Sequence, residues 1–140
     1  MDSRLKVYTG GTFDLFHAGH ALFLKNCAVL GDVTVSLNTD EFIEEYKGHK
    51  PVISYADREK VLRSCKYVKD VIPNVGGADS KIAIMRVKPQ VVAIGTDWVG
   101  KDYYKQMSFT QEWLDEQGIV LVYIAYAPYI SSTKIRERMK

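Results

Sequence analysis

The feature that most constrains the fold is an alternation between short Val- and Ile-rich runs and longer segments whose apolar residues recur at helical spacing. The strands predicted in this way cover residues 5–9, 33–37, 68–72, 90–94 and 120–124. The helices predicted between and after them cover residues 19–30, 40–46, 54–65, 80–87 and 110–117, with a last helix beginning at 131. Largely apolar strands that alternate with helices predict an α/β fold with a doubly wound, mostly parallel sheet of Rossmann-like type.

Length and charge narrow the class of protein. A chain of 140 residues predicts one domain over residues 1–140. A net charge of +2 argues against extended binding to nucleic acid, and no apolar run approaches the length that spans a bilayer, so no membrane is expected. Cys27 and Cys65 are interpreted as free thiols, and the chain shows no secretory leader. These features predict a cytoplasmic protein.

Two local signals predict helix boundaries. Ser54 and Asp57 are spaced as in a capping box, which predicts that the Ser54 side chain caps the helix that follows it. Gly31 follows the apolar run of the first helix and is predicted to end it.

Ligands of such folds bind beyond the carboxyl ends of the strands, and the segment after the first predicted strand suits that role. Residues 9–20 contain a glycine pair that lets backbone approach a ligand, followed by a helix start that favours anions. His17 and His20 are three residues apart, so both rings can face one bound group and donate hydrogen bonds to phosphate oxygens. Two alternatives stay open here. The histidines can be a capping or core pair, or a metal pair that would need further ligands.

Residues 11–20, GTFDLFHAGH, resemble the HxGH signature of the cytidylyltransferase-type nucleotidyltransferase superfamily, most closely that of the glycerol-3-phosphate cytidylyltransferases. The resemblance extends over nearly the whole chain. It includes Arg58 and the segments NTDEF at 38–42, KYVKDVIP at 66–73, GTDWVGK at 95–101 and ISSTKI at 130–135.

The resemblance implies roles for particular residues. His17, His20 and Lys47 would be catalytic, with the histidines stabilising charge on the attacked α-phosphate. Phosphate or acceptor binding would fall to Arg58, Lys50 and Lys66. The residues implied to bind the nucleotide are Gly10, Gly11, Thr12, Phe13, Asp97, Trp98, Ser131, Ser132 and Thr133. No metal-ligating residue is implied.

Some positions depart from the family pattern. Tyr126 and Tyr129 occupy places where the second signature of the family has arginine and glycine, so a phosphate contact is lost or moved to Arg136 or Arg138. Lys66 replaces an arginine and keeps its charge without the bidentate fork. These departures affect the predicted acceptor more than the predicted donor.

The resemblance implies an enzyme that transfers CMP from CTP to a small phosphorylated alcohol such as glycerol 3-phosphate and releases pyrophosphate. Mg²⁺ would accompany the triphosphate, and the protein would be a homodimer. Two alternatives are kept. One is an adenylyltransferase of the same superfamily that acts on a sugar phosphate, FMN or phosphopantetheine. The other is a nucleotide-binding protein without catalytic activity.

Overall fold

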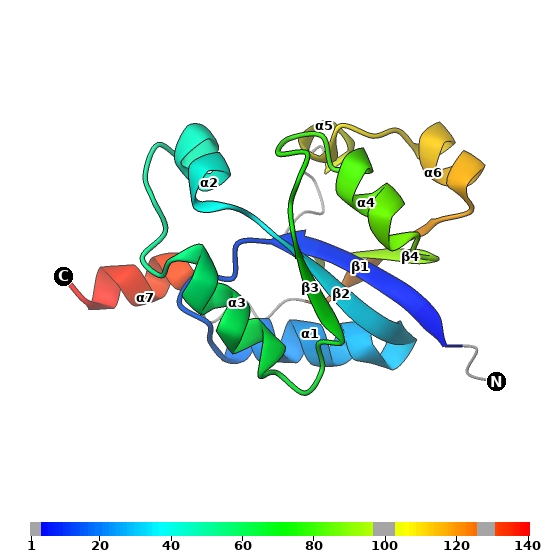
Figure 1. Ribbon diagram of the computed structural model, residues 1–140. Helices are drawn as coiled ribbons and strands as arrows, with labels where there is room; N and C mark the ends of the chain where they lie inside the picture. Colours follow the sequence, from blue (N-terminus) through cyan, green and yellow to red (C-terminus); the bar gives the residue numbers. More distant parts are fainter. Residues whose placement is uncertain (1–3, 97–102, 126–130) are drawn as a thin grey trace.

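A computed structural model describes residues 4–96, 103–125 and 131–140 (Figure 1). Five parallel strands form one sheet in the order β3-β2-β1-β4-β5, with helices on both faces, as predicted. The strands are β1 (Leu5–Gly11), β2 (Gly31–Leu37), β3 (Asp70–Pro73), β4 (Val91–Gly95) and β5 (Val120–Ile124). The helices are α1 (Ala18–Leu30), α2 (Asp40–Lys47), α3 (Tyr55–Arg63), α4 (Lys81–Val87), α5 (Tyr103–Met107), α6 (Gln111–Gln117) and α7 (Ser132–Arg138).

Strand β1 lies at the centre of the sheet and fixes where the functional loops meet. It pairs with β2 along its full length, from Leu5 opposite Gly31 to Gly11 opposite Leu37, and with β4 on its other side. Because all pairs are parallel, the loops after β1, β2, β3 and β4 leave from the same edge of the sheet.

Two apolar layers hold the helices against the sheet. One layer includes Phe23 and Leu24 of α1 and Leu62 of α3, packed on one face. The other includes Ile84 of α4 and Leu114 of α6, packed on the opposite face. All five side chains are at most 5% exposed, so each face of the sheet has a dry core, as a doubly wound sheet requires.

Gly31 ends α1, as predicted, because the helix closes at Leu30 and Gly31 is its C-cap residue. It is already the first residue of β2, in extended backbone, and α1 passes directly into the strand. A Cβ atom at this position would lie 2.1 Å from the carbonyl oxygen of Leu5. The glycine is therefore required by the close approach of β1 and β2.

The capping box predicted at Ser54 is wrong. Ser54 is the N-cap residue of α3, but its side chain makes no capping hydrogen bond. The backbone N–H of Tyr55 instead donates to Oδ2 of Asp40 at 3.3 Å, so a carboxylate from α2 caps this helix. A partner 15 residues away is invisible to a local capping pattern.

Helix α5 was not predicted from the sequence. This short helix is attached to the start of α4 by side-chain contacts rather than by a strong apolar pattern. Ser80 Oγ donates to the carbonyl oxygen of Met107 at 2.5 Å, and Ser108 Oγ donates to that of Ala78 at 2.9 Å. These contacts place α5 beside the carboxyl edge of the sheet.

Candidate active site

A cavity of about 310 Å³ opens at the carboxyl edge of the sheet, over the ends of β1, β2 and β4. Its wall includes residues that follow β1, the C-terminal end of α2 and the start of α7. The predicted site residues that line it are Gly10, Gly11, Thr12, Phe13, His20, Lys47 and Ser132. Asp97, Trp98, Tyr126 and Tyr129 lie outside the described residues.

The loop between β1 and α1 has an unusual backbone. Phe13 and Leu15 have φ values of 50° and 52°, in the left-handed region that non-glycine residues rarely adopt. Phe13 turns its ring back over Gly11, where a Cβ atom would lie 2.8 Å from the ring. Strained conformations of this kind persist where the surrounding structure fixes them, and they concentrate at functional sites.

His17 and His20 form an interlocked pair at the start of α1. His17 is the N-cap residue, and its Nδ1 accepts a hydrogen bond from the N–H of Gly19 at 3.0 Å. The backbone N–H of His17 in turn donates to Nδ1 of His20 at 3.2 Å. The two rings stack with their centroids 3.8 Å apart. The alternative that the histidines are a capping pair is therefore correct for their Nδ1 atoms, which accept backbone hydrogen bonds at the start of α1. It leaves the Nε2 atom of each ring for another role.

These contacts determine which nitrogen of each neutral ring carries the proton. Because Nδ1 accepts a hydrogen bond in both residues, the proton lies on Nε2, which becomes a donor. Nε2 of His17 is buried and has no hydrogen-bond partner among the described residues. A buried donor without a partner is costly, so a bound acceptor oxygen would complete the site.

Both histidines are uncharged at neutral pH. Burial lowers the pKa of His17. For His20, burial first and repulsion from His17 second lower the pKa to about 3, although Asp14 acts in the opposite direction. The pair can therefore donate N–H groups to an anion without carrying a positive charge of its own.

Acidification is expected to destabilise the protein through His20. The pKa of this ring is 6.5 ordinarily and about 3 when folded, so between these values the unfolded chain binds more protons. Stability is therefore complete above pH 6.5 and falls as the pH decreases, by about 2 kcal/mol near pH 5. Thermal unfolding across this range should show a steeper loss for the wild type than for His20→Asn. Parallel curves for the two proteins would contradict the assignment.

Asp14 organises the loop and was not predicted as a site residue. Its carboxylate is 5% exposed and accepts hydrogen bonds from the backbone N–H groups of Val52 at 2.8 Å and Ile53 at 2.9 Å. Its carbonyl oxygen accepts a hydrogen bond from Ser132 Oγ at the start of α7. One residue thus joins three segments that border the cavity. The feature of the sequence that could have indicated this role is a single carboxylate in a loop that otherwise carries no acidic or basic residue except His17.

Two cations border the cavity near Asp14. Arg136 lies 3.6 Å from Oδ2 of Asp14, and it is one of the two arginines that were expected to replace the missing family arginine. Lys47 comes from the end of α2. Burial and then the charge of Arg136 lower its pKa, while Asp14 raises it. This side of the cavity is therefore positive and suits a polyphosphate.

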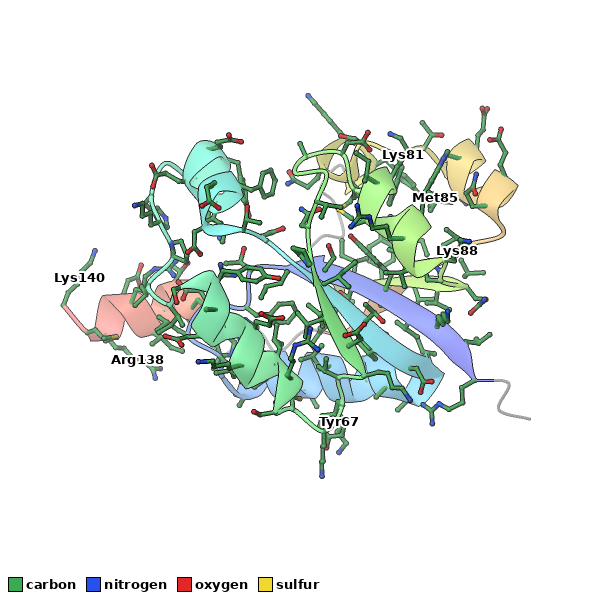
Figure 2. The ribbon with its side chains drawn as sticks, viewed as in Figure 1. Tyr67, Lys81, Met85, Lys88, Arg138 and Lys140 are labelled. Carbon is green, nitrogen blue, oxygen red and sulfur yellow. The ribbon has the colours of Figure 1, made fainter. Side chains whose placement is uncertain are left out.

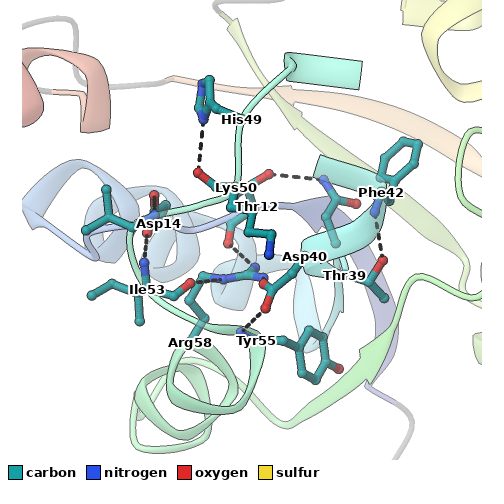
Figure 3. Close-up of polar contacts among 12 residues, drawn as sticks. Thr12, Asp14, Thr39, Asp40, Phe42, His49, Lys50, Ile53, Tyr55 and Arg58 are labelled. Atoms are coloured by element: carbon teal, nitrogen blue, oxygen red, sulfur yellow. Dashed lines mark hydrogen bonds and ion pairs between the residues drawn. The ribbon is translucent and has the colours of Figure 1, made fainter. Parts of the chain in front are cut away.

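Arg58 is not among the residues that line the cavity, because its guanidinium is used inside the protein (Figure 3). Nε donates to the carbonyl oxygen of Ile53 at 2.9 Å, and one terminal nitrogen donates to that of Thr12 at 2.8 Å. The other terminal nitrogen pairs with Asp40 at 2.6 Å. With a side chain that is 1% exposed, Arg58 supports the loop from inside the protein.

The remaining residues that were predicted to bind phosphate or nucleotide lie in different parts of the structure. Lys50 is exposed and lies beside the acidic face of α2, outside the main cavity. Lys66 precedes β3 and so lies at the amino edge of the sheet, where its ammonium group lies over the ring of Tyr67. Figure 2 shows Tyr67 away from α2 and α7. Ser131 caps α7 by accepting from the N–H of Lys134, and Thr133 accepts from Arg136. The structure gives Lys66 no place near a ligand in this cavity.

Within residues 4–96, 103–125 and 131–140, no group of three or more His, Cys, Asp and Glu side chains could hold a metal ion. Among these residues, the stacked histidine pair has no set of further ligands of the kind that a metal site needs. No helix in the described part of the chain is long and apolar enough to cross a membrane.

A five-stranded parallel sheet with a glycine-rich, histidine-containing loop at its carboxyl edge defines an α/β protein with a Rossmann-like nucleotidyltransferase fold. A family model described as cytidylyltransferase-like matches residues 8–138, and the chain belongs to this family.

Two of its relatives have different activities. A glycerol-3-phosphate cytidylyltransferase from Bacillus subtilis (strain 168) is 36% identical over 136 residues, which is 96% of this chain and 96% of that protein. An FAD synthase from Pyrococcus horikoshii is 41% identical over 97 residues, which is 69% of this chain. The match spans 66% of the length of that FAD synthase, slightly less than two thirds.

A solved structure supports the fold. The lipopolysaccharide core biosynthesis protein from Thermoplasma volcanium superposes with a TM-score of 0.71 at 24% sequence identity. The superposition covers 90% of this chain and 98% of that one. At this level of identity, the likeness concerns the arrangement of strands and helices.

Proposed function

We propose that this protein transfers CMP from CTP to a small phosphorylated alcohol, with glycerol 3-phosphate as the favoured acceptor. The observation that carries the proposal is the stacked histidine pair, in which the tautomer of each ring is fixed with the proton on Nε2. His20 lines a cavity with a positive side, and His17, which does not line it, stacks on His20. An enzyme that joins two anionic substrates needs such preorganised donors, because positioning and charge stabilisation supply most of the rate in phosphoryl transfer.

The proposed step needs no covalent enzyme intermediate. An oxygen of the acceptor phosphate attacks the α-phosphorus of the triphosphate, and the bond from that phosphorus to the bridging oxygen of the β-phosphate breaks as pyrophosphate leaves. The acceptor phosphate is already ionised at neutral pH, so no general base is required. His17 and His20 would donate hydrogen bonds to the α-phosphate as its negative charge develops. Lys47 and Arg136 would hold the departing phosphates.

The nucleotide donor would be a magnesium complex of the triphosphate. Asp14 is the one carboxylate among the described residues that line the cavity, and both of its oxygens already accept backbone hydrogen bonds. The protein therefore offers no cage for a divalent cation in its described part. Mg²⁺ retains water readily and binds phosphate oxygens, which fits an ion that enters with the substrate.

Two observations favour a small acceptor. Among relatives matched over nearly the full chain, the glycerol-3-phosphate cytidylyltransferase from Bacillus subtilis is 36% identical, whereas an FAD synthase from Thermococcus kodakarensis is 28% identical over 97% of the chain. A cavity of about 310 Å³ also lies at the lower end of ligand pockets, which leaves little room for a flavin beside a nucleotide. Transfer of AMP to FMN is the second candidate, favoured by the 41% identity to an FAD synthase.

The test is a matrix of the four nucleoside triphosphates against phosphorylated polyols, sugars, amino alcohols, FMN and phosphopantetheine, read by pyrophosphate release. We expect CTP with glycerol 3-phosphate to give the highest kcat/KM. A clear preference for ATP would overturn the donor, and CTP turnover with another phosphate alone would overturn only the acceptor. Binding of nucleotide without pyrophosphate release under any condition would indicate a non-catalytic protein. The homodimer and the cytoplasmic location implied by the resemblance stay predictions.

A further inference from the structure

The cavity has a neutral side opposite its positive one. Asn38 follows β2 and Asn74 follows β3, and both line the cavity together with Gly77 and with Gln106 of α5. None of these four residues carries a charge. The lysine and arginine that line the cavity, Lys47 and Arg136, come instead from α2 and α7.

A chain of side-chain amides fixes the orientation of Asn74. Asn38 Nδ2 donates to Thr12 Oγ1 at 3.1 Å, and Asn38 Oδ1 accepts from Asn74 Nδ2 at 3.0 Å. The same nitrogen of Asn74 donates to the carbonyl oxygen of Gly77 at 3.0 Å. Both donor positions of this amide are thus occupied, and its orientation is set by two acceptors. Oδ1 of Asn74 is buried and has no partner among the described residues.

The strand order separates the two substrates. The family resemblance assigns the nucleoside to residues that come after β4 in the sequence, and β4 pairs with one side of β1. Asn38 and Asn74 follow β2 and β3 on the other side. The histidine loop follows β1 between them, and the bond to Thr12 connects the amide chain directly to that loop. An acceptor whose phosphate attacks the α-phosphorus at the histidines would therefore carry its carbon skeleton toward Asn74.

We propose that Asn74 Oδ1 accepts a hydrogen bond from a hydroxyl group of the acceptor, so that Asn74 selects phosphorylated alcohols bearing a further neutral donor. This inference rests on the proposed function. The oxygen can only accept, so an acceptor with a carboxylate at this place would meet repulsion. An acceptor with an ammonium group would lack a counter-charge, because Asp14 is the one carboxylate among the described lining residues and already has partners.

The inference is tested by removing the contact from either partner. Glycerol 3-phosphate is compared with 2-hydroxypropyl phosphate and 3-hydroxypropyl phosphate, which each lack one hydroxyl, at saturating CTP. The proteins are the wild type, Asn74→Ala and the control Asn26→Ala, which changes an asparagine of α1 that does not line the cavity. Melting temperatures check that each variant is folded.

We expect wild-type kcat/KM to fall about 2- to 12-fold for one of the two analogues, the range of a single neutral hydrogen bond. Asn74→Ala should lower kcat/KM for glycerol 3-phosphate by a similar factor and abolish the preference over that analogue, with KM for CTP unchanged. Asn26→Ala should behave as the wild type.

Three outcomes would overturn the inference. Equal loss in Asn74→Ala for glycerol 3-phosphate and both analogues would show a structural role and would leave the proposed function standing. If Asn74→Ala does not fold, equal wild-type kcat/KM for all three acceptors overturns the selection of a hydroxyl. Absence of turnover with any acceptor or triphosphate would overturn the proposed function and this inference together.

Discussion

Replacement of His17 or His20 by alanine is expected to lower kcat about 10²- to 10³-fold with a smaller effect on nucleotide affinity, the usual loss for one preorganised donor to a developing charge. The physical reason is that each Nε2–H has its position set before substrate binds, by the Nδ1 contacts at the start of α1. Steady-state kinetics by pyrophosphate release measure the effect. Activity within about threefold of the wild type for both variants would remove the histidines from the mechanism.

Alanine also removes a helix cap, so two further variants of His17 separate capping from chemistry. In His17→Asn, a side-chain oxygen can still accept from the N–H of Gly19, because asparagine is a favoured N-cap, but nothing remains at the place of Nε2. In His17→Gln, an amide N–H reaches toward that place and the cap is lost. We expect the asparagine variant to be stable and inactive. The glutamine variant should lose about 1 kcal/mol of stability and keep more activity.

Replacement of Arg58 by alanine is expected to lower the free energy of unfolding by about 3 kcal/mol. Removing one partner of a buried ion pair commonly costs about 3–5 kcal/mol, and the lower end applies because the Asp40 carboxylate is 32% exposed and can be hydrated. The carbonyl oxygens of Thr12 and Ile53 would also lose their donors. Activity should fall as well, because Thr12 belongs to the histidine loop.

Arg63 provides the matched control for Arg58. It lies on the same helix with its side chain 49% exposed and pairs with Glu59 and Asp70. Exposed ion pairs contribute about 1 kcal/mol or less, so Arg63→Ala should be nearly neutral. Urea unfolding of both variants, with triphosphate titration, decides the role. Unchanged stability of Arg58→Ala combined with weaker triphosphate binding would instead support direct contact with phosphate.

The sequence predicted the strands well because each contains a short run rich in apolar residues, which burial on both faces explains for β4, where all five residues are buried. Each of the five predicted strands is present, and β5 has the predicted bounds. Helix α5 escaped prediction because it is short and is held by the hydrogen bonds of Ser80 and Ser108. Hydrogen bonds of this kind cannot be predicted from the spacing of apolar residues.

The site was predictable where it depends on a local motif. The spacing of His17 and His20 correctly placed two rings side by side at a helix start, but it could not show that both Nδ1 atoms are already occupied. Arg58 shows the corresponding limit for a single charged residue. Its partners Asp40 and Thr12 are 18 and 46 residues away, and only the folded chain decides whether a guanidinium turns inward or toward a ligand.

The position of Asp14 at the junction of three segments has a consequence for how the protein folds. Its partners are 38 and 39 residues away in the chain at Val52 and Ile53, and 118 residues away at Ser132. Helix α7, which includes Ser132, has no buried residues and is absent from both cores. The sheet and its covering helices can therefore assemble first, and the loop with left-handed Phe13 and Leu15 is fixed only when these distant contacts close.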